Sequence, residues 1–359
     1  MTATVKNSSS ACRRANIDCL RVFLMVLVIL HHYSVHTPWP FSSNAVLSRD
    51  TLIVLLGAGG KVANDGFFLI SGYLGIRSRF KSKSVLRIVL QTLFYSWIFL
   101  CIFGFATSWQ GPAGYPFTFE NVQRAVFPCT GKMYGFVTDF IMVMIASPFL
   151  RLIYGQLRET QRSFVGITGF LFFSVLPAIF LRNEYLWYGI WYCYVYFLGG
   201  CIRDAEERVA RGLYPGGMRS KRFDFIGCVF RHSLGVTICG LLFGFVTVVG
   251  IKFLNLRGRM SFLSCDYFVM RDWTPSTFLI SIGLTCVFLK IRITKMGSIW
   301  SLAGQSVFGI YLLHDNPVFR LWCWPHFSVF YGFGIPGILA GGTFAVALFI
   351  MQEIGRAHV

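Results

Sequence analysis

Long apolar stretches, separated by short polar segments, follow one another along most of the chain. A helix needs about 20 mostly apolar residues to cross the hydrocarbon core of a membrane, and stretches close to that length recur from residue 19 onward. The pattern predicts an all-α, polytopic integral membrane protein with about ten transmembrane helices. The predicted spans are 19–36, 51–75, 87–107, 134–152, 163–181, 185–202, 233–253, 275–290, 298–313 and 328–351.

The composition agrees with this pattern. Hydrophobic residues make up 55% of the 359 residues and charged residues only 13%, whereas a soluble domain has about 25% charged residues. Such a chain cannot cover itself with a charged surface in water, which excludes a soluble enzyme, a coiled coil and a disordered chain. The 11 cysteines include no Cys-x-x-Cys pair, so we expect neither a disulfide framework nor a cysteine zinc site.

The net charge of +18 is consistent with nucleic-acid binding or with membrane anchoring. The basic residues adjoin apolar spans, which favours cytoplasmic anchors in a lipid bilayer over a nucleic-acid partner. With a cytoplasmic N-terminus, the predicted inner segments carry twenty Lys and Arg residues and the outer segments nine. This asymmetry predicts a multi-pass protein of the cell (plasma or inner) membrane with both termini in the cytoplasm.

We expect a single domain over residues 1–352, because no internal repeat of the transporter kind is present. The outer segment 108–132 is rich in Gly, Pro and aromatic residues, which is typical of an ordered loop over a vestibule. Residues 353–359 match the in-frame translation of a common sequencing-library adapter. We therefore expect that tail to be non-native.

The first span carries ionisable residues on one face. Arg21 and His32 are 11 residues apart, close to three helical turns, so they share a face about 16 Å apart along the axis. Asp18 and His36 fall within about 60° of that face, and His31 points about 100° away from His32. Ionisable groups inside a membrane usually line a pathway; the alternative is that Arg21 snorkels to the inner headgroups and the histidines lie at the outer interface.

The histidines also have the i, i+4 spacing of metal ligands. His32 and His36 could bind one ion from the same helix face, but the sequence offers no clear third ligand nearby. We therefore expect no metal.

Two further segments contain polar residues within apolar spans. In the second span, Asp65 needs a partner, and Lys61 lies one turn earlier. Ser71-Gly72 either lets a neighbouring helix approach closely or serves function. The segment 306–317 ends in His314-Asp315-Asn316-Pro317, which is either a helix end at the water interface or a functional site.

Together these segments resemble the type 3 membrane acyltransferase family, O-acyltransferases that modify surface polysaccharides and other extracytoplasmic acceptors. The matches are Arg21 followed after ten residues by His32, the motif at 67–73, the motif at 309–314 and a weaker one at 146–150. The resemblance covers about residues 16 to 350. One departure is the basic pair Arg77-Ser78-Arg79, which many members space as Arg-x-x-Arg.

The resemblance implies transfer of an acyl group, usually acetyl, from cytoplasmic acyl-CoA to a hydroxyl of an extracytoplasmic glycan or glycolipid. A neutral His32 suits the general base that activates this hydroxyl. The separation of about 16 Å between Arg21 and His32 is comparable to the length of a pantetheine arm. Because CoA is an anion, a cytoplasmic mouth of basic residues would hold its phosphates. The expected donor site comprises Arg21, Ser71, Tyr73, Arg77, Arg79 and Lys81.

Besides Arg21 and His32, we assign His314 and Asp315 to the catalytic site, at the acceptor end of the predicted ninth span. For the acidic partner that the family is proposed to use, the sequence offers Asp139, Asp65 and Glu184. The competing function is a transporter or flippase, in which the stripe on the first span lines a path for an anionic or glycan substrate. Paired discontinuous helices in two halves would favour transport, and the sequence contains none.

Overall fold

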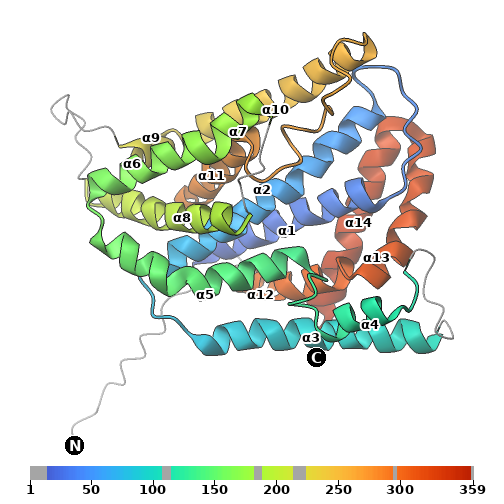
Figure 1. Cartoon of the computed structure of the whole chain (residues 1–359), viewed down its shortest axis with the longest axis horizontal. Coiled ribbons are helices and arrows are strands. Elements are labelled where there is room, and N and C mark those ends of the chain that lie inside the picture. Colours follow the sequence, from blue (N-terminus) through green and yellow to red (C-terminus); the bar gives the residue numbers. More distant parts are fainter. Residues whose placement is uncertain (1–13, 107–114, 182–187, 213–223, 294–296, 357–359) are drawn as a thin grey trace, which may run out of the picture.

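The computed structural model describes residues 14–106, 115–181, 188–212, 224–293 and 297–356, and every regular element among them is helical. Figure 1 shows the elements as one helical bundle. They are α1 (Ala15–His36), α2 (Arg49–Gly75), α3 (Ser82–Ala106), α4 (Phe119–Val126), α5 (Gly135–Gln156), α6 (Glu159–Phe170), the π turn η1 (Leu171–Val175), α7 (Leu176–Phe180), α8 (Tyr188–Ala210), α9 (Phe225–Arg231), α10 (Ser233–Leu256), α11 (Pro275–Lys290), α12 (Gly297–His314), α13 (Pro317–Cys323), the 3-10 segment η2 (Trp324–Phe333) and α14 (Gly334–Arg356).

Helices α1 and α2 form the centre of the bundle (Figure 1). Helix α1 packs against α2, α11, α12 and α14, and α2 also packs along α8. About half of the apolar stretch of α1 and of α2 is buried, but only 17% of that of α3. Large apolar side chains such as Phe94, Phe149 and Val246 are exposed on α3, α5 and α10. An exposed apolar surface of this kind suits contact with lipid.

Among the described residues, seven helical segments are long and apolar enough to cross a membrane, which makes this a multi-pass membrane protein by length and composition. The predicted number of about ten is not confirmed. Helix α11 is apolar but has only 16 residues, and neither α8 nor α12 is among the seven. The seven are Ala15–His36, Arg49–Gly75, Ser82–Gly104, Gly135–Gln156, Glu159–Phe180, Ser233–Leu256 and Pro317–Met351.

Helix α8 continues to Ala210, beyond the end of the predicted apolar span 185–202. Acidic side chains in its last two turns form ion pairs with Arg14, Arg77 and Arg162, which lie outside α8. These pairs stabilise turns that the apolar pattern alone does not predict. Helix α14 ends at Arg356, inside the segment 353–359. Residues 357–359 lie outside the described residues, and the non-native origin of the tail stays a prediction.

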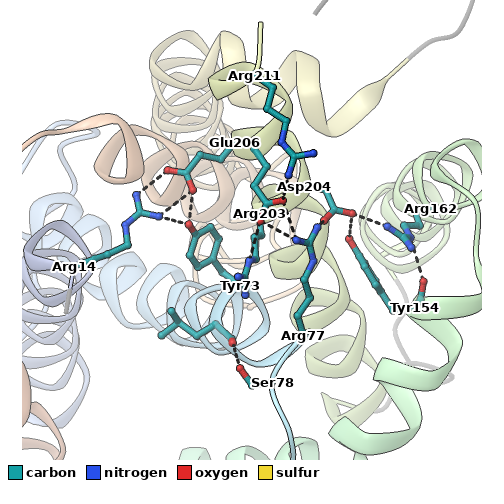
Figure 2. A network of polar contacts seen from close by, with 12 residues as sticks. Arg14, Tyr73, Arg77, Ser78, Tyr154, Arg162, Arg203, Asp204, Glu206 and Arg211 are labelled. Carbon is teal, nitrogen blue, oxygen red and sulfur yellow. Dashed lines mark hydrogen bonds and ion pairs between the residues drawn. The ribbon is translucent and has the colours of Figure 1, made fainter. Parts of the chain in front are cut away.

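Ion pairs join several helix ends at one pole of the bundle (Figure 2). Arg14, just before α1, makes a two-pronged ion pair with Glu206 of α8 at 3.0 and 2.7 Å, and the Tyr73 hydroxyl of α2 contacts both residues.

A second group of contacts at this pole surrounds Asp204 of α8. Arg77 contacts Asp204 and lies 2.8 Å from Glu207. Arg162 of α6 and Tyr154 of α5 also bind Asp204, at 2.6 and 2.5 Å. We call this cluster the Arg14 pole.

The opposite pole lies at the start of α2. There Lys252 of α10 donates to Ser48 and Thr51 at the start of α2, and Arg49 donates to the Tyr331 carbonyl at 3.0 Å. Arg14, Arg77 and Arg162, which the charge pattern assigns to one side of the membrane, therefore lie together at one pole. Which pole faces the cytoplasm stays a prediction.

Helices α2 and α8 cross at glycines, and this confirms the role of Gly72 in close helix packing. A Cβ atom added to Gly72 would lie 1.8 Å from the Tyr196 carbonyl oxygen, and one added to Gly199 would lie 2.2 Å from the Leu69 carbonyl oxygen. Backbone atoms cannot move aside as a flexible side chain can, so only glycine fits at this crossing.

Replacing Gly72 by alanine is expected to destabilise the protein by about 1–3 kcal/mol, because overpacking forces the two helices apart. The matched control is Gly250→Ala in α10, where an added Cβ meets nothing within 4 Å and alanine favours the helix. The measurement is the fraction that stays monodisperse in detergent after a heating series. Equal heat tolerance of the two variants would contradict the close crossing.

Candidate active site

A cavity of about 270 Å³ lies among α1, α2, α3, α5 and α12. Arg21 lines it, and its guanidinium also donates to Asp18 at 2.8 Å. Asp18 packs against Gly304 of α12, and this places Arg21 beside the first half of that helix. Tyr311 lines the cavity two helical turns further along α12. The remaining lining residues are mainly apolar: Met25, Val28, Asn64, Phe67, Ile70, Ser71, Ile88, Gln91, Phe136, Val137, Phe140, Gly304, Gln305, Val307 and Phe308.

A cluster of ionisable side chains lies beyond Tyr311, which we call the histidine cluster: His32, His36, His314, Asp315 and Arg320. The ring centroids of His32 and Tyr311 are 6.5 Å apart, so the cluster borders the cavity residue Tyr311. The ring centroid of His32 lies 5.0 Å from that of His36 and 4.9 Å from that of His314.

The Asp315 carboxylate is the centre of this cluster. Its Oδ1 atom lies 3.5 Å from His32 Nε2, 4.0 Å from His36 Nε2 and 3.5 Å from Arg320 Nη1. The local sequence explains the position. Asn316 accepts from the Val318 amide at 3.0 Å and so caps α13, and Pro317 begins that helix. The chain therefore turns directly after α12 and presents Asp315 to α1.

Two buried imidazole nitrogens in the cluster have no hydrogen-bond partner among the described residues: Nδ1 of His32 and Nε2 of His314. His314 Nδ1 lies 2.5 Å from the Ile310 carbonyl oxygen. A carbonyl oxygen only accepts, so Nδ1 carries the proton, and Nε2 of a neutral ring carries the lone pair. Buried nitrogens without partners are rare in folded proteins and point to a functional role.

The structure brings some of the predicted site residues together and separates others. His32, His314 and Asp315 meet in the histidine cluster, and Arg21 and Ser71 line the neighbouring cavity. The predicted donor residues Tyr73 and Arg77 lie instead in the ion-pair network of the Arg14 pole (Figure 2). The remaining two, Arg79 and Lys81, are exposed between α2 and α3.

The predicted acidic residues are elsewhere. Asp65 is buried and accepts a hydrogen bond from Trp191 Nε1 at 2.9 Å. Lys61, which the sequence suggests as a partner for Asp65, makes an ion pair with Asp272, just before α11, at 3.4 Å. Asp139 lies on α5, outside the cavity lining. Glu184 lies outside the described residues. The carboxylate beside His32 is Asp315.

Sequence reasoning missed Tyr311, Arg320 and Asn64. Tyr311 connects the cavity to the histidine cluster, and Asn64 lines the cavity while donating to Asp272 at 2.9 Å. A charged residue within a largely apolar segment is a usable signal for Arg320. For Tyr311 the usable signal is its place in the motif at 309–314, because an aromatic residue in an apolar span is otherwise ordinary.

His31 confirms the predicted difference between neighbouring histidines. Its Nδ1 contacts the Gly57 carbonyl oxygen of α2, whereas His32 faces Tyr311 and His314 of α12. His31 therefore packs against α2, and His32 packs against α12.

Comparison with known proteins gives one match. The family model described as an acyltransferase domain matches residues 14–351. No curated protein and no solved structure gave a significant match. Because the family model covers nearly the whole described bundle, including the cavity and the histidine cluster, the chain belongs to the acyltransferase 3 family and is a membrane acyltransferase.

Proposed function

We propose that this protein transfers an acyl group, acetyl in the first instance, from cytoplasmic acyl-CoA to a hydroxyl of an extracytoplasmic glycan or glycolipid at the cell membrane. One observation carries the proposal. Helix α1 presents Arg21 to an apolar cavity and, 11 residues further along, presents His32 to Asp315, while Tyr311 borders both places.

The cavity suits the donor. Its apolar walls fit an acyl chain and the pantetheine arm, and Arg21 at one end would bind a phosphate of CoA by paired hydrogen bonds. Arg79 and Lys81 are exposed near the Arg14 pole and would add positive charge that attracts the anionic CoA. Tyr73 and Arg77 would support the donor site only indirectly, because their polar groups already bind Glu206 and Asp204.

The histidine cluster suits the chemical step. The lone pair of His32 Nδ1 would accept the proton of the acceptor hydroxyl as the oxygen attacks the thioester carbonyl. The C–S bond then breaks, and the CoA thiolate takes the proton back from the imidazolium. Asp315, 3.5 Å from Nε2, would stabilise the imidazolium while it exists, as a carboxylate does in catalytic triads. His314 would orient the acceptor through Nε2.

A comparison of cells with and without the gene tests the acceptor class. We expect ester-linked acetyl groups on surface glycans or glycolipids, measured by mass spectrometry before and after mild base, to depend on the gene. Complementation by the intact gene should restore them, and complementation by a His32→Ala gene should not. Identical acetylation in all strains would refute a glycan or glycolipid acceptor.

The direction of transfer predicts which side of the membrane two exposed segments face. A cysteine at Glu120 of α4 should react with an impermeant thiol reagent in intact cells, and a cysteine at Arg211 should react only after lysis, because the basic segments stay in the cytoplasm. Both side chains are exposed. The background must lack the exposed native thiols of Cys101, Cys228 and Cys239. Labelling with the opposite sidedness would overturn the assignment of a cytoplasmic donor.

A further inference from the structure

We propose that His32, His36 and Asp315 form a binding site for a divalent transition-metal ion, zinc above all, and that the bound ion inhibits acyl transfer. The binding rests on the geometry of the histidine cluster alone. The inhibition also rests on the proposed function, because it requires His32 to act as the base.

The three residues have the geometry that such an ion needs. Each offers one ligand atom, and the three atoms lie within 4.8 Å of one another. Two of the separations are 3.5 Å, from His32 to Asp315, and 4.0 Å, from His36 to Asp315. Tetrahedral zinc with bonds of about 2.0–2.1 Å holds its ligand atoms roughly 3.3 Å apart. Side-chain movements of less than about an ångström would therefore close the site around an ion.

A fourth nitrogen lies close by. The ring of His314 is 4.9 Å from that of His32, it is fully buried, and its Nε2 has no hydrogen-bond partner among the described residues. Its Nδ1 faces the Ile310 carbonyl oxygen, which is the arrangement that orients metal-ligating histidines. Nε2 is therefore available to bind the ion or a water molecule on it.

The ligand types select the ion. Imidazole nitrogen with one carboxylate oxygen suits zinc and its neighbours, whereas magnesium and calcium prefer sites built from oxygen. The side chain of His36 is 24% exposed, which gives the ion a route from solvent.

The charge of Arg320 makes the site weak and reversible. Its Nη1 atom lies 3.5 Å from the same Asp315 oxygen that would bind the ion. A guanidinium in that place repels a dication and competes with it for the carboxylate. The site therefore suits an ion that comes and goes with its concentration, and an ion bound to His32 would prevent this residue from accepting a proton.

Zinc chloride titrated into the purified protein tests the site, with binding followed by calorimetry and cobalt(II) substitution followed by visible absorption. We expect about one saturable zinc ion that depends on His36. His36→Gln should weaken binding at least about tenfold, whereas the control His326→Gln, outside the cluster in η2, should bind as the original chain does. Arg320→Gln should bind several-fold tighter, a gain that misfolding cannot produce. Equal affinity in the chain with and without His36, or no saturable binding, would overturn the site.

Activity separates this proposal from the proposed function. Zinc should slow the release of CoA from acetyl-CoA, a chelator should restore it, and His36→Gln should need at least about ten times more zinc. Activation by zinc would overturn the inhibition. Zinc binding that depends on His36 in a chain without acyltransferase activity would leave the site standing and refute the proposed chemistry. CoA release that stays unchanged at saturating zinc would support the acyltransferase activity and overturn the inhibition.

Discussion

Replacing His32 by alanine is expected to lower acyl transfer by about 10²–10⁴-fold, the usual contribution of a general base, while the protein still accumulates in the membrane. The buried Nδ1 of His32 has no partner among the described residues, and Asp315 lies 3.5 Å from its Nε2. Alanine removes the proton acceptor and leaves the apolar cavity in place. The measurement is transfer of radiolabelled acetyl from acetyl-CoA to base-labile esters in isolated membranes.

The matched control is the neighbouring residue. His31 faces α2 and contacts the Gly57 carbonyl oxygen, so His31→Ala should affect helix packing and reduce transfer far less than His32→Ala. A chain that needs His31 and functions without His32 would contradict the assignment of the reactive face of α1.

Replacing Arg21 by alanine is expected to weaken acyl-CoA binding at least about tenfold, because a charge-assisted hydrogen bond to a phosphate is lost at the cavity. Arg21→Lys should restore binding only in part, since an ammonium group cannot form the paired hydrogen bonds of a guanidinium. Calorimetry in detergent with acetyl-CoA gives the affinity directly.

Arg259→Ala is the control for the loss of one positive charge. Arg259 is exposed in the segment after α10, toward the opposite pole from the expected donor site. This variant should bind acetyl-CoA as the original chain does. Unchanged affinity in both Arg21 variants would remove Arg21 from the donor site, even if the protein proves to be active.

Contacts within one helix were predictable from the sequence, because the helical period fixes them. The period of 3.6 residues placed Arg21 and His32 on a common face of α1 and turned His31 away. In the structure the first two face α12 and the third faces α2. The family motif at 309–314 likewise identified His314, and the polar residues that follow it include Asp315; both lie beside His32.

Contacts between helices were not predictable, because spacing along the chain carries no information about them. Lys61 makes an ion pair with Asp272, a residue of a distant segment that the sequence did not indicate as its partner. Tyr73 and Arg77 bind acidic residues of α8, so two residues assigned to the donor site lie in a structural network. The extra turns of α8 were missed for the same reason, since their charges are satisfied by partners on other helices.

Release of CoA by the purified protein tests the central claim most directly. The protein, in detergent or in liposomes, is mixed with acetyl-CoA, and free thiol is measured with and without a hydroxyl-bearing glycan acceptor. The account predicts that the original chain releases CoA slowly without acceptor. With acceptor it should release CoA faster and form acetyl ester on the glycan. His32→Ala should show neither CoA release above the background nor acetyl ester. Release no faster than without protein, or equal release by His32→Ala, would contradict the assignment of this chain as an acyl-CoA-dependent acyltransferase with His32 as its base.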